Sequence, residues 1–218
     1  MGLSGGGKRS SPRHRTRTNS NLAHEQYASY LAAVGRFDEA IAESTIALEI
    51  DPNSYTSQRN RGRILYLARR YDEAILQFKR VWEVHQDLGV FAGWLWVSYE
   101  MKGDHAQAYE WFMKIQKRTN PQLIELFQNA YETSGWQGVR QKVFELQLIN
   151  EQNPSTNYYG MARQCALLGK KEQAFEYLNK AIENRAGQVQ MLNVEPPFDI
   201  LRDDPRFDEL VKRVGIQQ

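Results

Sequence analysis

Residues 55–88 read YTSQRNRGRILYLARRYDEAILQFKRVWEVHQDL, and this stretch decides the fold. It contains two runs with helical spacing, separated by a turn at Arg69-Arg70. The flanking segments 21–54 and 89–122 align with it without a gap, so the pattern recurs with a period of 34 residues. This period is typical of helix–turn–helix repeats, in which each helix pair stacks on the next. The sequence therefore predicts an all-α solenoid.

The period continues after residue 122 in a less regular form. We expect a degenerate fourth repeat at 121–154, with its turn at Gly135, and a regular fifth repeat at 155–189. Within 190–218, prolines break the chain into short turns before a last amphipathic helix. Because a solenoid needs a cover for its terminal apolar face, this helix is predicted to be a cap. The predicted domain is thus about five helix pairs over 21–189 with a C-terminal capping helix.

Small side chains recur at the positions where two helix axes must approach closely. They are Ala28, Gly62 and Ala162 on first helices and Ala40, Ala74, Ala108 and Ala174 on second helices. The fourth repeat departs from this pattern, because Gln128 and Arg140 stand at its small positions. We therefore expect the fourth repeat to be helical but irregular.

Length and composition exclude several classes of protein. The chain has 218 residues, of which 41% are hydrophobic and 25% charged, so it can form a sizeable core and is neither collagen-like nor wholly disordered. Its longest apolar stretch is too short for a membrane-spanning helix. A single cysteine excludes an internal disulfide and any CxxC site. These features favour a reducing, cytoplasmic location.

The first 20 residues differ in composition from the rest. They are rich in Gly, Ser and Arg and nearly free of apolar side chains, which predicts a disordered tail over 1–20. The basic side chains of this tail are Lys8, Arg9, Arg13, Arg15 and Arg17. Such a tail can attract nucleic acid weakly by counterion release, or it can serve as a solubilising linker. Both interpretations stay open.

No motif indicates catalysis or a cofactor. The four histidines lie in separate segments without metal-ligand spacing, and Cys165 falls at a core position of the fifth repeat. The glycine-rich start, which ends in Gly7-Lys8, has Arg9 where a phosphate-binding loop needs Ser or Thr. We therefore predict a non-enzyme that holds neither a cofactor nor a metal.

The small-residue framework, with prolines after the second helices, resembles tetratricopeptide repeats over about Asn21 to Val189. The phrases YASYLAAVGRFDEAIAES, ARRYDEAILQFKR and FDILRDDPRFDELVKRVG are similar to the C-terminal repeat regions of bacterial winged-helix regulators and serine/threonine kinases. The resemblance implies a right-handed superhelix and a protein-interaction scaffold in bacterial signalling or assembly. It points to the receiving half of such a protein, either free-standing or a fragment of a longer chain.

In this family the first helices line a concave groove that usually binds a peptide or helix. The resemblance assigns this role to first-helix positions of the second to fifth repeats. They are Arg59, Arg63, Tyr66, Trp94, Val97, Met101, Glu125, Asn129, Tyr159 and Arg163. The basic clamp that some relatives use for chaperone C-termini is not expected, because Glu25 and Ser29 stand where its first Lys and Asn belong.

The first helix of the third repeat is apolar on two sides, so it is either buried on both or meets a ligand. Trp94, Val97 and Met101 form one of its stripes and are a candidate apolar floor for a partner. Two other functions remain as alternatives: a structural subunit that self-associates through this stripe, and a regulatory protein that acts through its basic tail.

Overall fold

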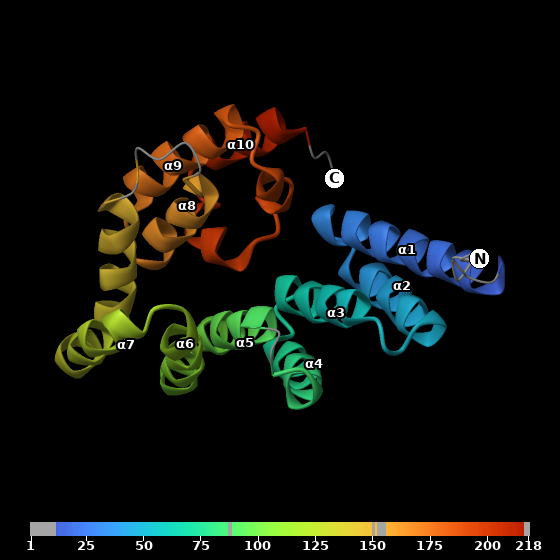
Figure 1. The fold of residues 1–218 in the computed structure, drawn as a ribbon. Coiled ribbons are helices and arrows are strands. Elements are labelled where there is room, and N and C mark those ends of the chain that lie inside the picture. The colour runs from blue at the N-terminus through green and yellow to red at the C-terminus, as the bar shows by residue number, and fades with distance from the viewer. Residues whose placement is uncertain (1–11, 87–88, 150, 152–155, 216–218) are drawn as a thin grey trace, which may run out of the picture.

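The computed structural model of the chain describes residues 12–86, 89–149, 151 and 156–215. Helices make up all of the regular secondary structure in these ranges, and consecutive helices pack against each other in pairs. The predicted all-α solenoid is therefore confirmed. Figure 1 shows the pairs following one another around an arc, which brings the last helix toward the first.

Four regular helix pairs form most of this arc. They are α1 (Pro12–Ala33) with α2 (Phe37–Ile50), α3 (Tyr55–Leu67) with α4 (Tyr71–Val84), α5 (Gly89–Lys102) with α6 (His105–Thr119), and α8 (Tyr158–Leu167) with α9 (Lys171–Glu183). The short turn η1 (Pro121–Leu123) and the long helix α7 (Ile124–Ile149) lie between the third pair and the last. After α9 come the short turns η2 (Gly187–Met191) and η3 (Pro196–Leu201) and then the helix α10 (Pro205–Val214).

Helix α1 begins earlier than the sequence predicts. A disordered tail was expected over 1–20, whereas residues 12–20 continue the first helix of the first repeat. A helix that is already nucleated gains a hydrogen bond with each added residue, and Pro12 suits a first helical turn because its missing N–H is not needed there. The structure thus differs from the prediction at 12–20, and residues 1–11 lie outside the described part of the chain.

Small side chains lie at the points of closest helix approach. The alanines of both predicted sets have no exposed surface: Ala28, Ala40, Ala74, Ala108, Ala162 and Ala174. At Gly62 on α3, an added methyl group would lie 2.4 Å from the ring of Phe78 on α4. Phe78 is itself fully buried and its ring lies beside those of Phe91 and Trp94, so it has no space into which to move. The contact between α3 and α4 therefore depends on a glycine at position 62.

The degenerate fourth repeat is a long helix with a kink. Ser134 and Gly135 leave helical geometry inside α7, at the place where its turn was expected. Beyond the kink, the buried guanidinium of Arg140 pairs with the buried carboxylate of Glu100 on α5. Trp136 donates its indole N–H to the same carboxylate. A buried ion pair thus takes the place of the small residue that the other repeats use.

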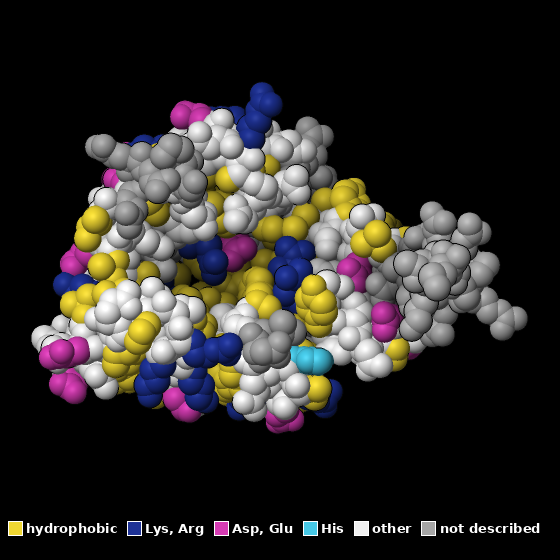
Figure 2. All heavy atoms as spheres, in the orientation of Figure 1, with side chains coloured by type: hydrophobic (Ala, Val, Ile, Leu, Met, Phe, Trp, Pro, Cys, Tyr) yellow, Lys and Arg dark blue, Asp and Glu magenta, His cyan; other side chains and the backbone are white. Residues whose placement is uncertain are grey.

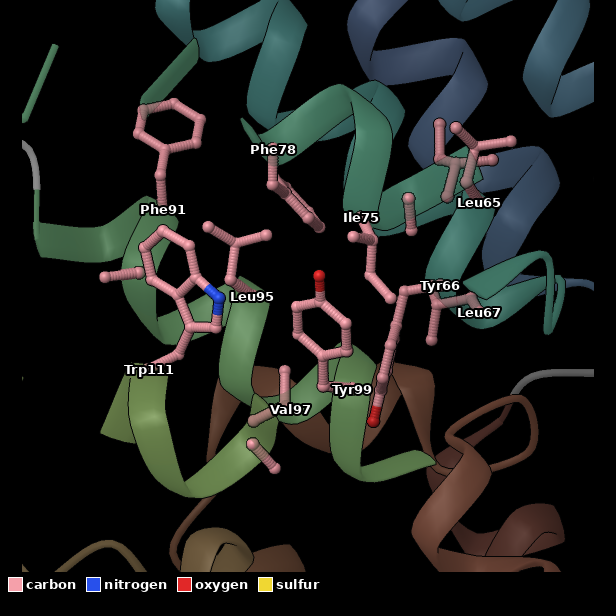
Figure 3. Packing of buried hydrophobic residues seen from close by; sticks show 14 of the residues in the cluster. Leu65, Tyr66, Leu67, Ile75, Phe78, Phe91, Leu95, Val97, Tyr99 and Trp111 are labelled. Atoms are coloured by element: carbon pink, nitrogen blue, oxygen red, sulfur yellow. The ribbon is translucent and has the colours of Figure 1, made fainter. Parts of the chain in front are cut away.

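The apolar side chains form two cores that meet within α7. The N-terminal core extends from α1 to Val139 on α7, and the C-terminal core begins at Phe144 and reaches α10. We call the two parts the N-terminal half and the C-terminal half. Figure 3 shows the middle of the N-terminal core, where Tyr66 and Phe78 lie among side chains of α3, α4 and α5.

Residues 187–201, which we call the strap, cross the inside of the arc (Figure 1). Four apolar side chains of the strap are buried in the C-terminal core: Val189, Leu192, Phe198 and Leu201. Val194 is buried in the N-terminal core instead. The turns expected after the fifth repeat therefore contact both halves of the molecule.

Substitution of two helical glycines tests the close approach of α3 and α4. Around Gly93 on α5 no atom lies within 4 Å of an added methyl group. Gly93→Ala is therefore expected to raise the free energy of unfolding by about 1 kcal/mol, the usual gain in helix propensity. Gly62→Ala has the same gain but overpacks the core at a cost of about 1–3 kcal/mol, so we expect a net loss of up to about 2 kcal/mol. Urea denaturation of both variants measures this, and equal stabilisation by both would contradict the contact.

The ion pair on α7 gives a second expectation. Removal of one partner from a buried ion pair costs about 3–5 kcal/mol, and Arg140→Met leaves the Glu100 carboxylate buried without its cation. We expect a loss of stability of this size. Glu100→Gln in the same chain removes the charge but keeps an acceptor for Trp136, so the double variant should recover part of the loss. Chemical denaturation measures the free energy of unfolding of Arg140→Met and of the double variant. A double variant less stable than Arg140→Met alone would contradict the role of the ion pair.

Candidate functional site

The inside of the arc holds an open cavity of about 1090 Å³. First helices form its floor and one wall, while the strap and the end of α10 form the other wall. Its lining residues are Glu25, Gln26, Ser29, Tyr30, Ala33 and Val34 of α1, Thr56, Arg59, Asn60 and Arg63 of α3, Val90 and Trp94 of α5, and Gln190, Met191, Val214 and Gly215. Figure 2 shows a hollow on this face with apolar side chains at its floor and basic side chains beside them. We call this space the open cavity.

Two guanidinium groups lie in the open cavity without a carboxylate partner. Arg63 is half-buried, and its Nη2 atom lies 3.2 Å from Asn60 Oδ1 and 3.3 Å from Ser29 Oγ. Arg59 lies one turn earlier on α3 and is exposed. Neither arginine forms an ion pair within the described part of the chain. Burial lowers the pKa of the Arg63 guanidinium because the charged form loses water, and the negative charge of Glu195 on the strap opposes this shift without forming an ion pair with Arg63.

Among the described residues that line the cavity, Glu25 supplies the carboxylate, and this group is engaged by α3. Its Oε1 atom accepts hydrogen bonds from Ser57 and from Thr56, the latter at 3.2 Å. The backbone oxygen of Glu25 accepts from the hydroxyl of Ser29 at 2.9 Å and from the amide of Asn60 at 3.2 Å. These bonds hold Ser29 and Asn60 in place, so both can orient Arg63.

Apolar side chains surround the two arginines. Trp94 stacks on Phe78 with ring centroids 5.8 Å apart, and its ring also meets Tyr66 edge-on at 5.5 Å. Val90 and Tyr30 are exposed at the rim of the cavity. Trp94 therefore has two roles: it supports the core with one part of its ring and lines the cavity with another. The cavity offers apolar surface directly beside two cations.

Three residues predicted to line a groove are instead buried. Tyr66, Val97 and Tyr159 are 0%, 9% and 3% exposed. Tyr159 meets the ring of Phe198, a strap residue, edge-on at 5.4 Å, and Tyr66 and Val97 belong to the N-terminal core. The strap covers Tyr159, and the N-terminal core encloses Tyr66 and Val97, so the assignment of these three residues to an accessible groove is corrected.

The other predicted residues lie away from the open cavity. Met101 packs half-buried against the N-terminal core, and Arg163 forms an ion pair with Glu195, an acidic residue of the strap, at 3.3 Å. Glu125 and Asn129 are exposed on α7, where Asn129 borders a separate shallow depression. Of the ten groove candidates, the structure brings only Arg59, Arg63 and Trp94 together in the open cavity.

Sequence reasoning missed the wall that closes the cavity. Met191 on the strap and Val214 on α10 face α1 and α3 across the cavity, although only turns and a cap were expected there. A signal was available, because the apolar run Met191-Leu192 and the nearby Val194 must be buried by something. The sequence does not say which surface buries them.

The basic tail and Cys165 are not among the described residues that line the open cavity. Lys8 and Arg9 lie outside the described residues, and Arg13, Arg15 and Arg17 fall in α1 at positions whose side chains are not described. Cys165 is fully buried, and burial raises the pKa of its thiol to about 12. The described residues contain no cluster of three or more His, Cys, Asp or Glu side chains that could hold a metal. None of the described helices combines the length and apolar character needed to cross a membrane.

Comparison with known proteins identifies one repeat. Residues 155–187 match the family model of the tetratricopeptide repeat and include α8 and α9, within the fifth repeat expected at 155–189. No curated protein matches the chain. Tetratricopeptide repeats generally mediate protein–protein interaction. The chain therefore carries a tetratricopeptide repeat at residues 155–187, within an all-α stack of helix pairs.

Proposed function

We propose that this protein is a non-catalytic interaction module that binds a peptide or helix of a partner protein in the open cavity. The partner segment carries an acidic side chain next to a bulky apolar one. The observation that carries this proposal is Arg63, a half-buried cation whose described hydrogen-bond partners are the neutral oxygens of Asn60 and Ser29.

A carboxylate suits this position for both charge and geometry. Guanidinium groups bind carboxylates through paired, charge-assisted hydrogen bonds, which are stronger than bonds to neutral acceptors. In Arg63 the described bonds use only Nη2, so the remaining N–H groups can serve a ligand. Arg59, exposed one turn away on the same helix, can add a second cationic contact.

The apolar part of the ligand would rest between the two walls. Trp94 and Val90 of α5 supply the floor, while Tyr30 and Met191 line opposite sides. At about 1090 Å³ the open cavity has room for a few side chains of a ligand. A short helix or an extended peptide of mixed character fits this volume, which supports the choice of a protein partner.

The wider setting of this function rests on the sequence. A place in bacterial signalling or assembly and a cytoplasmic location follow from the resemblance described above and stay predictions. Weak nucleic-acid association through Lys8, Arg9, Arg13, Arg15 and Arg17 stays an alternative, as does self-association. Salt-dependent retention on DNA that is lost with residues 1–18 would favour the former.

Selection from a peptide library tests the proposed ligand chemistry. The full chain is expected to enrich peptides that place Asp or Glu beside a bulky apolar residue. Arg63→Met keeps the length of the side chain but removes its charge, and a charge-assisted hydrogen bond contributes about 1.5–3 kcal/mol, so the enriched peptides should bind at least about tenfold more weakly. Titration calorimetry or fluorescence anisotropy with one such peptide measures the loss.

A matched variant controls for the change of charge. Arg80 is exposed on α4, the second helix of its pair, and is not among the cavity residues. Arg80→Met should therefore leave peptide affinity unchanged. Equal losses for Arg63→Met and Arg80→Met, or enriched peptides without acidic residues, would argue against the proposal.

A further inference from the structure

We propose that the strap is a latch between two halves that hinge about α7, and that opening of the latch widens the open cavity. The first observation is the division of the apolar side chains. On α7 the last fully buried side chain of the N-terminal core is Val139, and the C-terminal core begins at Phe144. The half-buried Val143 and Leu146 still pack against the N-terminal core, so the boundary between the two cores runs within one helix. Bending of this helix would leave most of the packing inside each half in place.

The strap belongs to the C-terminal half but reaches the other. Leu192, Phe198 and Leu201 anchor it in the C-terminal core, and these contacts persist if the halves separate. Its contacts with the N-terminal half are few by comparison. Val194 is buried there, Met191 packs against the same core, and Asp199 is held by Arg69.

The ion pair between Arg69 and Asp199 requires a strained backbone at Arg69, which the turns of other repeats avoid. The turn between paired helices has a glycine with positive φ at Gly35, Gly103 and Gly169. In the second repeat this position is Arg69, with φ of 61°, a conformation that disfavours a side chain. The guanidinium of Arg69 makes two hydrogen bonds to the carboxylate of Asp199, at 2.6 and 3.2 Å. An arginine is therefore present where glycine fits the backbone better, and its side chain joins the two halves.

The closed contact also leaves a buried hydroxyl poorly satisfied. The hydroxyl of Tyr159 is buried and has no hydrogen-bond partner within the described part of the chain. The hydroxyl of Tyr66, from the other half, lies close enough to the guanidinium of Arg163 to interact with it, and Arg163 also pairs with Glu195 at 3.3 Å. An unpaired buried hydroxyl opposes closure, because opening would let water reach it. Apolar contact and the interactions of Arg163 thus favour the closed state, and the buried hydroxyl of Tyr159 opposes it.

Opening would act directly on the open cavity. Arg63 and Trp94 belong to the N-terminal half, whereas Met191 and Val214 belong to the C-terminal wall. Separation of the halves moves these walls apart. A segment that contacts both walls would in turn favour the closed state. This coupling rests on the proposed function, but the latch itself does not.

Two thiols in one chain can measure the latch without any ligand. Val194→Cys places a thiol at the contact with the N-terminal half, while the native Cys165 lies in the C-terminal core with no exposed surface. Each modification rate by a soluble disulfide reagent is divided by the rate of the same thiol in denaturant. This division removes the difference in intrinsic reactivity between the two positions, so that the ratio reports how often each thiol becomes exposed.

If the latch opens on its own, the thiol at position 194 should react at least tenfold faster than Cys165. Arg69→Gly in the same chain removes the ion pair and gives the turn the glycine found in other repeats, so the fold should persist. An exposed ion pair is a modest contact, so we expect the rate at position 194 to rise about fivefold in this variant. In the chain that keeps Arg69, the rate at position 194 should rise with salt concentration, because salt screens the ion pair. The rate of Cys165 should not change.

Asp203→Asn is the matched control, since Asp203 is exposed beside the strap and no ion pair or hydrogen bond involves its side chain within the described residues. It should leave both rates unchanged, whereas Asp199→Asn should act like Arg69→Gly. Equal corrected rates for the two thiols in the Val194→Cys chain that keeps Arg69 and Asp199 would overturn the proposal, since position 194 would then become exposed only by global unfolding. Unchanged reactivity at position 194 in Arg69→Gly at every salt concentration would also overturn it.

Discussion

The close approach of paired helices is the constraint on which the rest of the structure depends. Where a methyl group or only a hydrogen atom stands between two axes, the helices can pack along their length, and large side chains such as Phe78 fill the space beside them. The orientation of each pair then decides which residues of the first helices face the inside of the arc. Arg59 and Arg63 come to lie with Trp94 because α3 and α5 are held at this distance.

Much of the fold could be predicted from the residues that enforce this approach. The alanines at 40, 74, 108 and 174 recur with the period of the repeat, and each is buried as its place in the pattern requires. The fourth repeat is instructive because its pattern fails at Arg140. That failure has a physical cause, since the guanidinium reaches across to Glu100 and the two buried charges neutralise each other.

The site could be predicted only in part, because a repeat pattern describes contacts between neighbours. Arg59, Arg63 and Trp94 follow from the position of first helices, and the structure places all three in the cavity. Tyr66 and Tyr159 follow from the same rule, yet both are buried: Tyr66 lies in the N-terminal core, and Phe198 of the returning strap covers Tyr159. No period in the chain encodes that return, and the ion pair between Arg69 and Asp199 joins residues too far apart for a local pattern to connect them.

The return of the strap also limits how this chain can change in length. An open stack of repeats can gain or lose a helix pair at little cost, because each pair contacts only its neighbours. Here one more pair inserted between α6 and α7 would carry Asp199 away from Arg69 and Val194 away from its core. Duplication of a repeat, the ordinary route by which solenoids grow, would therefore open the arc and remove one wall of its cavity. The closure of the arc thus fixes the number of helix pairs between Arg69 and the strap.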